Sequence, residues 1–171
     1  MTTTRRVFID MDGVLADFVG QYKALFGVEL VAGRGALDPD PPNFFENIDS
    51  NPRFFEDLPP LPNYDVLYNE LKDFDRLRSP IVLTAIPKRR TEQDTRMQKI
   101  RWVRRYLGKH VRVLVCPASA KAHFGRPGDV LVDDYVKHSE PWVNMGGVFV
   151  LHKSVDATIR TMDVMFKRNG Q

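Results

Sequence analysis

The chain has almost no cysteine and no long apolar segment. Cys116 is the single cysteine among 171 residues, so an internal disulfide framework is excluded and a reducing compartment is expected. No apolar run approaches the length that crosses a bilayer, and residues 1–6 contain no apolar signal region. We therefore expect a soluble, cytoplasmic protein with no membrane contact. The histidines show no metal-ligand spacing, so surface or packing roles are expected for His110, His123, His138 and His152.

A short apolar run over 7–9 is followed by two carboxylates, Asp10 and Asp12. A strand this apolar is typical of a parallel sheet that is buried on both faces, and ligands of such sheets lie beyond the carboxyl ends of the strands. Residues two apart in an extended chain project to the same side, so both carboxylates can reach one phosphoryl group or metal ion. Two like charges this close need a cation, and magnesium prefers oxygen ligands. The alternative is that these residues form only a polar turn after a strand.

The same pattern, an apolar run followed by polar residues, recurs three times. In a parallel sheet the carboxyl ends of these strands would lie side by side, so their polar residues would meet at one edge. Taken singly, a threonine at a strand end is usually a turn residue, and a single lysine is usually solvated. The runs and the residues that follow them are 81–83 with Thr84, 111–115 with Lys121, and 130–132 with Asp133 and Asp134.

Strands and helices alternate in the second half of the chain. Apolar spacing predicts a helix over 97–107, a fifth strand over 148–151, and a terminal helix over 155–166 that Ser154 caps. We therefore predict an α/β fold with a doubly wound, Rossmann-like, mostly parallel five-strand sheet that carries helices on both faces.

The segment between the first two strands, residues 15–78, is too long for a plain loop. Apolar residues recur at helical spacing near both of its ends, over 15–25 and over 67–74. We predict a small helical cap domain over 15–78, inserted into a core domain that consists of residues 1–14 and 79–171.

The order and type of these polar residues resemble the haloacid dehalogenase superfamily of phosphohydrolases, whose motifs run Asp-x-Asp, Thr or Ser, Lys, and paired Asp. Within it, three parts of the chain look most like 5'(3')-deoxyribonucleotidases: residues 10–18 (Asp-Met-Asp-Gly-Val-Leu-Ala-Asp-Phe), the strand end at Leu83-Thr84, and Val132-Asp133-Asp134 leading to Trp142 and Gly146-Gly147. The resemblance covers about residues 5–30 and 55–155. Ala85 departs from it, because these nucleotidases commonly carry serine after the threonine.

Phosphoryl transfer requires positioning and cations around a charged transition state, and each motif supplies one part. Asp10 would be the nucleophile that forms an aspartyl phosphate, and Asp12 the general acid and then the general base. Thr84 and Lys121 would bind the phosphate oxygens. Magnesium would be held by Asp10, the backbone carbonyl of Asp12, and Asp133 with Asp134 behind it.

The aromatic residues of the predicted cap suit a nucleobase, although most are expected to be core. Phe18 is the best candidate for a substrate contact, since it lies near the catalytic strand and matches an aromatic position that lines the base pocket in the resembling family. We place it one turn into the helix that follows. Asp17 is better explained as a helix cap than as a ligand.

The segment 88–109 carries nine basic and two acidic residues. The whole chain has a net charge of only +3, so the rest of the chain is net acidic. A nucleic-acid surface is one interpretation. The favoured one is a solvated helix face, with Lys88, Arg89 or Arg90 steering anionic substrates toward the phosphate site.

The sequence thus predicts a magnesium-dependent phosphomonoesterase that dephosphorylates deoxyribonucleoside or ribonucleoside monophosphates, as a monomer or homodimer. Two alternatives stay open. One is a phosphatase of the same superfamily that acts on another small phosphate ester or on polynucleotide ends. The other is an inactive module with this fold that binds nucleic acid through the basic segment. Base, sugar, and 5' versus 3' phosphate preference are not predicted.

Overall fold

The computed structural model describes residues 5–31, 40–86 and 92–166. Five strands form one sheet in which every neighbouring pair is parallel, in the order β3-β2-β1-β4-β5. The predicted α/β fold is confirmed, and the sheet is entirely parallel. The strands are β1 (Val7–Ile9), β2 (Ile81–Ile86), β3 (Val113–Pro117), β4 (Val130–Asp133) and β5 (Val148–Leu151).

Strand β1 lies at the centre of the sheet, where Phe8 is in register with Ile81 of β2 and Leu131 of β4. All three residues of β1 are fully buried, which explains why the strand has no polar residue. The chain passes from β1 to β2 and β3 on one side and returns to β4 and β5 on the other. The strand order therefore reverses next to β1, and ligands of open α/β sheets bind beyond the carboxyl ends at such a point.

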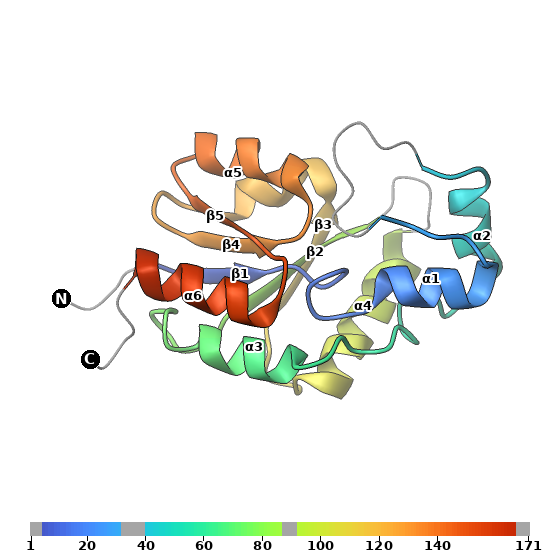
Figure 1. Ribbon diagram of the computed structural model, residues 1–171, viewed down its shortest axis with the longest axis horizontal. Helices are drawn as coiled ribbons and strands as arrows, with labels where there is room; N and C mark the ends of the chain where they lie inside the picture. Colours follow the sequence, from blue (N-terminus) through green and yellow to red (C-terminus); the bar gives the residue numbers. More distant parts are fainter. Residues whose placement is uncertain (1–4, 32–39, 87–91, 167–171) are drawn as a thin grey trace.

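Helices cover both faces of the sheet (Figure 1). Because side chains alternate along a strand, Val7 and Ile9 join the cluster that includes Trp102 and Met162, whereas Phe8 joins the cluster around Trp142. The helix α5 (Ser139–Asn144) covers the Phe8 face, and α3 (Tyr64–Leu71) lies against α6 (Val155–Met165) on the other side. Cys116 is buried in the Phe8 cluster, where burial raises the pKa of its thiol, as expected of a packing residue.

Two helices lie beyond the carboxyl edge of the sheet, α1 (Phe18–Phe26) and α2 (Phe44–Ser50) (Figure 1). The helix predicted from residue 15 begins only at Phe18. Asp17 is its N-cap, as predicted, and accepts a hydrogen bond from the backbone N–H of Gly20 at 2.8 Å. The division of the chain into a core domain and a cap over 15–78 stays a prediction; α3, although within this range, packs against α6.

The helices predicted in the second half are present. Residues 92–106 of the basic segment form α4 (Glu92–Tyr106), and α6 is capped by Ser154, whose hydroxyl accepts from the backbone N–H of Ala157 at 3.2 Å. Two short 3-10 helices, η1 (Ala118–Phe124) and η2 (Val136–His138), follow β3 and β4. Within the described ranges, no helix combines the length and apolar character needed to cross a bilayer.

Candidate active site

The loop after β1 turns sharply at Gly13. The backbone N–H of Asp10 still bonds to the carbonyl of Val132 at 2.9 Å, so the sheet geometry extends to the first carboxylate. Gly13 has a φ of +78°, and a Cβ there would lie 2.2 Å from a carboxylate oxygen of Asp134. Glycine is therefore needed at this position for two reasons, the positive φ and the close approach of Asp134.

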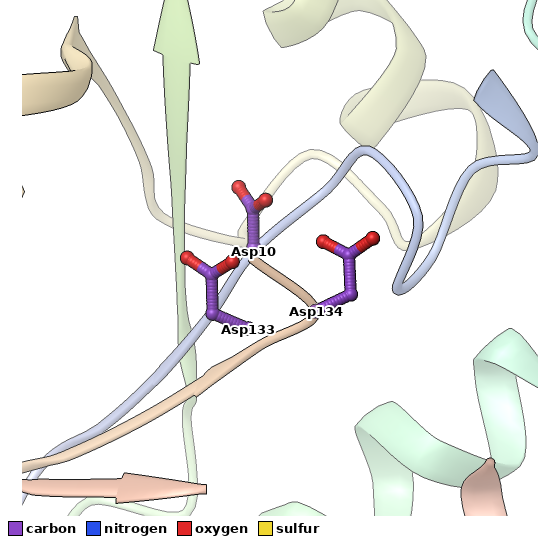
Figure 2. A group of neighbouring side chains, drawn as sticks. All are labelled: Asp10, Asp133 and Asp134. Atoms are coloured by element: carbon purple, nitrogen blue, oxygen red, sulfur yellow. The ribbon is translucent and has the colours of Figure 1, made fainter. Parts of the chain in front are cut away.

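Three carboxylates meet where β1 and β4 end (Figure 2). Asp10, Asp133 and Asp134 each offer an oxygen within 4.8 Å of the others. Burial, and then the charges of Asp10 and Asp133, raise the pKa of Asp134 to about 8. Burial also raises the pKa of Asp10 to about 6. Oxygen ligands this close suit a hard divalent cation, which would relieve their mutual repulsion, so this cluster could bind a metal ion.

Lys121 adds a buried ammonium to this cluster. Its Nζ lies 2.9 Å from Asp10 Oδ1 and 2.7 Å from Asp133 Oδ2. Burial alone would lower the pKa of Lys121, but the two carboxylates raise it above its usual value. The pKa of Asp133 is in turn lowered by Lys121 against the effect of burial. Asp133 and Lys121 are thus both charged, and Lys121 is held beside Asp10.

His138 is a site residue that the sequence did not reveal. The sequence predicts a surface or packing role for it, but its Nδ1 lies 2.7 Å from Asp133 Oδ2. The backbone N–H of Tyr135 donates to the other oxygen of Asp133 at 2.9 Å. The Nε2 of His138 is buried and has no hydrogen-bond partner in the described part of the chain. The only signal in the sequence is its place five residues after Asp133, which by itself is uninformative.

Lys99 is the second site residue that was missed. It was counted within the basic segment, yet its side chain is fully buried, and its Nζ bonds to Asp12 Oδ2 at 2.5 Å and to Thr84 Oγ1 at 2.9 Å. Helical spacing could have found it, because Lys99 is four residues before the buried Val103 on α4. Asp12 thus contacts an ammonium and stands outside the three-carboxylate cluster.

A cleft of about 590 Å³ opens over these residues. Acids line one part of it and phenylalanines another, with Phe18 next to Phe55 at a ring-centroid distance of 6.2 Å. Phe18 is the first residue of α1, and not one turn into it as predicted. The cleft brings together the following predicted and additional side chains: Asp10, Asp12, Asp134, His138, Phe18, Phe44, Phe45 and Phe55.

Three of the predicted site residues do not line this cleft: Thr84, Lys121 and Asp133. Thr84 and Asp133 are fully buried, and Lys121 is 2% exposed. Each already bonds to another site residue, Thr84 to Lys99 and Lys121 to Asp133. Their predicted contacts with phosphate and cation stay predictions. A second cleft, of about 830 Å³, lies on the other side of Gly13 and Asp134, and no described phenylalanine lines it.

The basic segment is only partly a solvated face. Arg101 bonds to Glu56 at 2.7 Å, and Arg105 and Arg53 approach the same carboxylate at 3.6 and 3.4 Å. Arg104 is exposed. The residues expected to steer substrate, Lys88, Arg89 and Arg90, lie outside the described ranges.

Comparisons with known proteins leave the family open. No protein-family model matches the chain, and no curated protein matches its sequence. Among solved structures, the chain is similar to a hydrolase from Streptococcus pneumoniae TIGR4, with 14% sequence identity and a TM-score of 0.49 over 96% of this chain and 99% of that chain. A likeness of this degree shows neither the family nor the reaction of the present chain.

Proposed function

We propose that this chain is a magnesium-dependent phosphomonoesterase of the haloacid dehalogenase type, whose preferred substrates are nucleoside monophosphates. One observation carries the proposal. Asp10, at the end of the central strand, lies 2.9 Å from the Lys121 ammonium and within 4.8 Å of two further carboxylates. Asp12, two residues later, forms an ion pair with a different lysine, Lys99. A nucleophilic carboxylate beside a cation-binding cluster and a second, separate acid is what stepwise phosphoryl transfer needs.

Asp10 is the nucleophile in this proposal. Its carboxylate oxygen bonds to phosphorus while the ester P–O bond breaks, and the leaving alkoxide takes a proton from Asp12. Asp12 is then a carboxylate and accepts a proton from the water that attacks the aspartyl phosphate. That attack releases inorganic phosphate and restores both acids. Lys99 supports this division of roles because its ammonium contacts Asp12 and fixes the direction of that carboxylate.

Cations surround the place where the phosphate would be. Lys121 offsets the charge of Asp10, which would otherwise repel an anionic ester. Thr84 accepts a hydrogen bond from Lys99 beside Asp12 and keeps its own hydroxyl proton to donate to a phosphate oxygen, while the buried Lys99 adds positive charge. Magnesium, held by Asp10, Asp133 and Asp134, would offset the negative charge of the phosphate. The raised pKa of Asp134 fits this assignment, because a cation would offset the repulsion from Asp10 and Asp133, which adds to the effect of burial.

The aromatic wall of the cleft supports a substrate with a planar ring. Phe18 lies with its ring centroid 6.1 Å from that of Phe44 and 6.2 Å from that of Phe55, and all three line the cleft near the acids. Phe54, 5.3 Å from Phe18, is fully buried and does not line the cleft. A nucleobase stacks well on such a surface. A sugar phosphate has no planar aromatic ring and would leave this surface without a stacking partner. The cleft volume, about 590 Å³, is within the range of small-molecule sites.

Phosphate release from 5' and 3' nucleoside monophosphates with magnesium tests the proposal. The panel includes ribose and deoxyribose forms, sugar phosphates and phosphate-ended oligonucleotides, with Asp10→Asn as the control. Turnover on nucleoside monophosphates that Asp10→Asn abolishes is the expected result. Turnover confined to sugar phosphates or oligonucleotide ends would contradict the proposed substrate class and support the proposed reaction. A folded protein that releases phosphate from no ester would contradict the proposal.

A further inference from the structure

The segment over 52–58, which carries Phe55, is bound along α4 by the buried amide of Gln98. Gln98 is 3% exposed, and its Oε1 accepts hydrogen bonds from the backbone N–H groups of Phe55 at 3.1 Å and Glu56 at 3.4 Å. Its Nε2 donates to the carbonyl of Pro52 at 2.9 Å. One side chain of the helix thus satisfies three backbone groups of a segment more than 40 residues earlier in the chain.

Neighbouring residues of α4 hold the same segment. Trp102, one turn after Gln98, donates its indole N–H to the carbonyl of Leu58 at 2.7 Å, and Arg101 bonds to Glu56. The first of these contacts is at Leu58, the last residue of the 52–58 segment, and the second is with the side chain of Glu56. Gln98, by contrast, bonds to the backbone of Phe55 itself.

The same turn of α4 also reaches the proposed catalytic acid. Lys99, which follows Gln98, bonds to Asp12, and its Nζ lies 4.6 Å from the centroid of the Phe55 ring. Phe55 lines the cleft together with Phe18. The aromatic wall and the acid are therefore placed relative to each other by two consecutive residues of one helix.

We propose that Gln98 is a specificity-determining positioning residue, which fixes the Phe55 ring in the cleft wall and so sets the preference for phosphate esters with a planar ring. The inference rests on the proposed function. Without the amide, two buried N–H groups and one carbonyl lose their partners, and the backbone at Phe55 must move to find others. The ring would then leave its place in the wall, while the acids, which Gln98 does not contact, would stay.

Two substrates separate this role from a general loss of structure. The experiment measures kcat/KM for a nucleoside monophosphate and for glycerol phosphate, which has no ring, in the wild type and in Gln98→Met. We expect the ratio of the two values to fall by roughly two- to tenfold, the range for one aromatic contact. We expect KM for the nucleotide to rise, and kcat for glycerol phosphate to stay unchanged. If Gln98→Met does not fold, Gln98→Asn, whose amide is one methylene shorter, is the second variant.

A double-mutant cycle with Phe55→Leu shows whether Gln98 acts through the ring. In the Phe55→Leu background, Gln98→Met should change the ratio no further. Arg104→Met, an exposed change on the same helix, should leave the ratio unaltered. An equal loss of kcat/KM for both esters in Gln98→Met, or an undiminished effect in the Phe55→Leu background, would overturn the inference. A wild type that hydrolyses neither ester would instead overturn the proposed function, and the inference with it.

Discussion

The ammonium of Lys99 lies 2.5 Å from a carboxylate oxygen of Asp12, although 87 residues separate the two in the chain. Lys99 is fully buried, whereas the Asp12 side chain is 24% exposed. The lysine therefore comes from behind the acid and leaves its other side open to the cleft. Asp12 Oδ1 is itself buried and has no hydrogen-bond partner among the described residues.

Removing the Lys99 ammonium should impair the chemical step more than substrate binding. In Lys99→Met, Asp12 and Thr84 lose their shared donor, and the acid is no longer held in one direction. We expect kcat to fall by about 10²- to 10³-fold, within the range for a general acid–base group. Steady-state kinetics with Arg104→Met as the surface control measures this. A fall in kcat/KM that comes entirely from KM would mean that Lys99 binds substrate without orienting Asp12.

Asp134 should make the cation-free protein less stable as the pH rises. Its pKa is about 8 in the folded chain and about 3.9 in an unfolded one. Between these values the unfolded state releases a proton that the folded state keeps, so stability falls with rising pH through this window. Asp134→Asn should remove this part of the slope and raise stability relative to the wild type near pH 8. Urea unfolding in the presence of a chelator, from pH 4 to pH 9, measures the difference.

The same variant should bind magnesium more weakly, because it loses one of three carboxylates. We expect a loss of affinity of more than about tenfold in calorimetric titration, which needs no turnover. Unchanged magnesium affinity in Asp134→Asn would place the cation elsewhere.

Gly13 and Gly27 form a matched pair for testing the loop after β1. Both have a positive φ, +78° and +68°, but a Cβ at Gly13 would meet Asp134 at 2.2 Å, whereas a Cβ at Gly27 would have no other part of the described chain, its two neighbours aside, within 4 Å. Gly27→Ala should therefore cost only the backbone strain, about 1 kcal/mol. Gly13→Ala should cost more, up to about 3 kcal/mol, and should also weaken magnesium binding by displacing Asp134.

Chemical unfolding and magnesium titration of both alanine variants separate the two effects. Equal destabilisation with magnesium affinity intact in both would show that the carboxylate of Asp134 moves aside at no cost.

His138 should influence cation binding through Asp133. Its Nδ1 bonds to the Asp133 oxygen that Lys121 also contacts, so the imidazole helps to fix the direction of that carboxylate. His138→Phe, which keeps the ring but has no donor, should weaken magnesium binding by about tenfold or more. His138→Asn, which retains an N–H donor, should recover part of the affinity. Calorimetric titration of both variants tests this, and equal affinity in wild type and His138→Phe would assign the ring to packing alone.

Much of the sheet and the acids of the site could be predicted, because the sequence patterns that indicate them are local. A parallel strand buried on both faces must be apolar along its whole length, so β1, β2 and β4 are visible as short runs in the sequence. The polar residue that ends such a run lies at the carboxyl edge, where ligands bind. The sequence pattern therefore predicts that Asp10, Asp133 and Asp134 lie near one another.

The helix boundaries and the basic segment were predicted less well. Leu15 fits the spacing of a helix, but the chain is still in the turn that Gly13 begins, and α1 starts only after Asp17 has capped it. The positive charge of 88–109 suggested a solvated face. Burial of Lys99 and the bonds from Arg101 to Glu56 depend on the segment that packs against α4, which sequence periodicity cannot identify.

The sequence by itself determined that this chain forms a parallel α/β sheet with acids gathered at its carboxyl edge, since both properties follow from which residues are apolar and which come next. Only the tertiary structure decided which side chains complete the site. Lys99, His138 and Gln98 are ordinary residues in their own segments, and they acquire their roles from partners on other strands and loops. Those partners are chosen by how helices pack on the sheet, which depends on contacts between residues far apart in the chain.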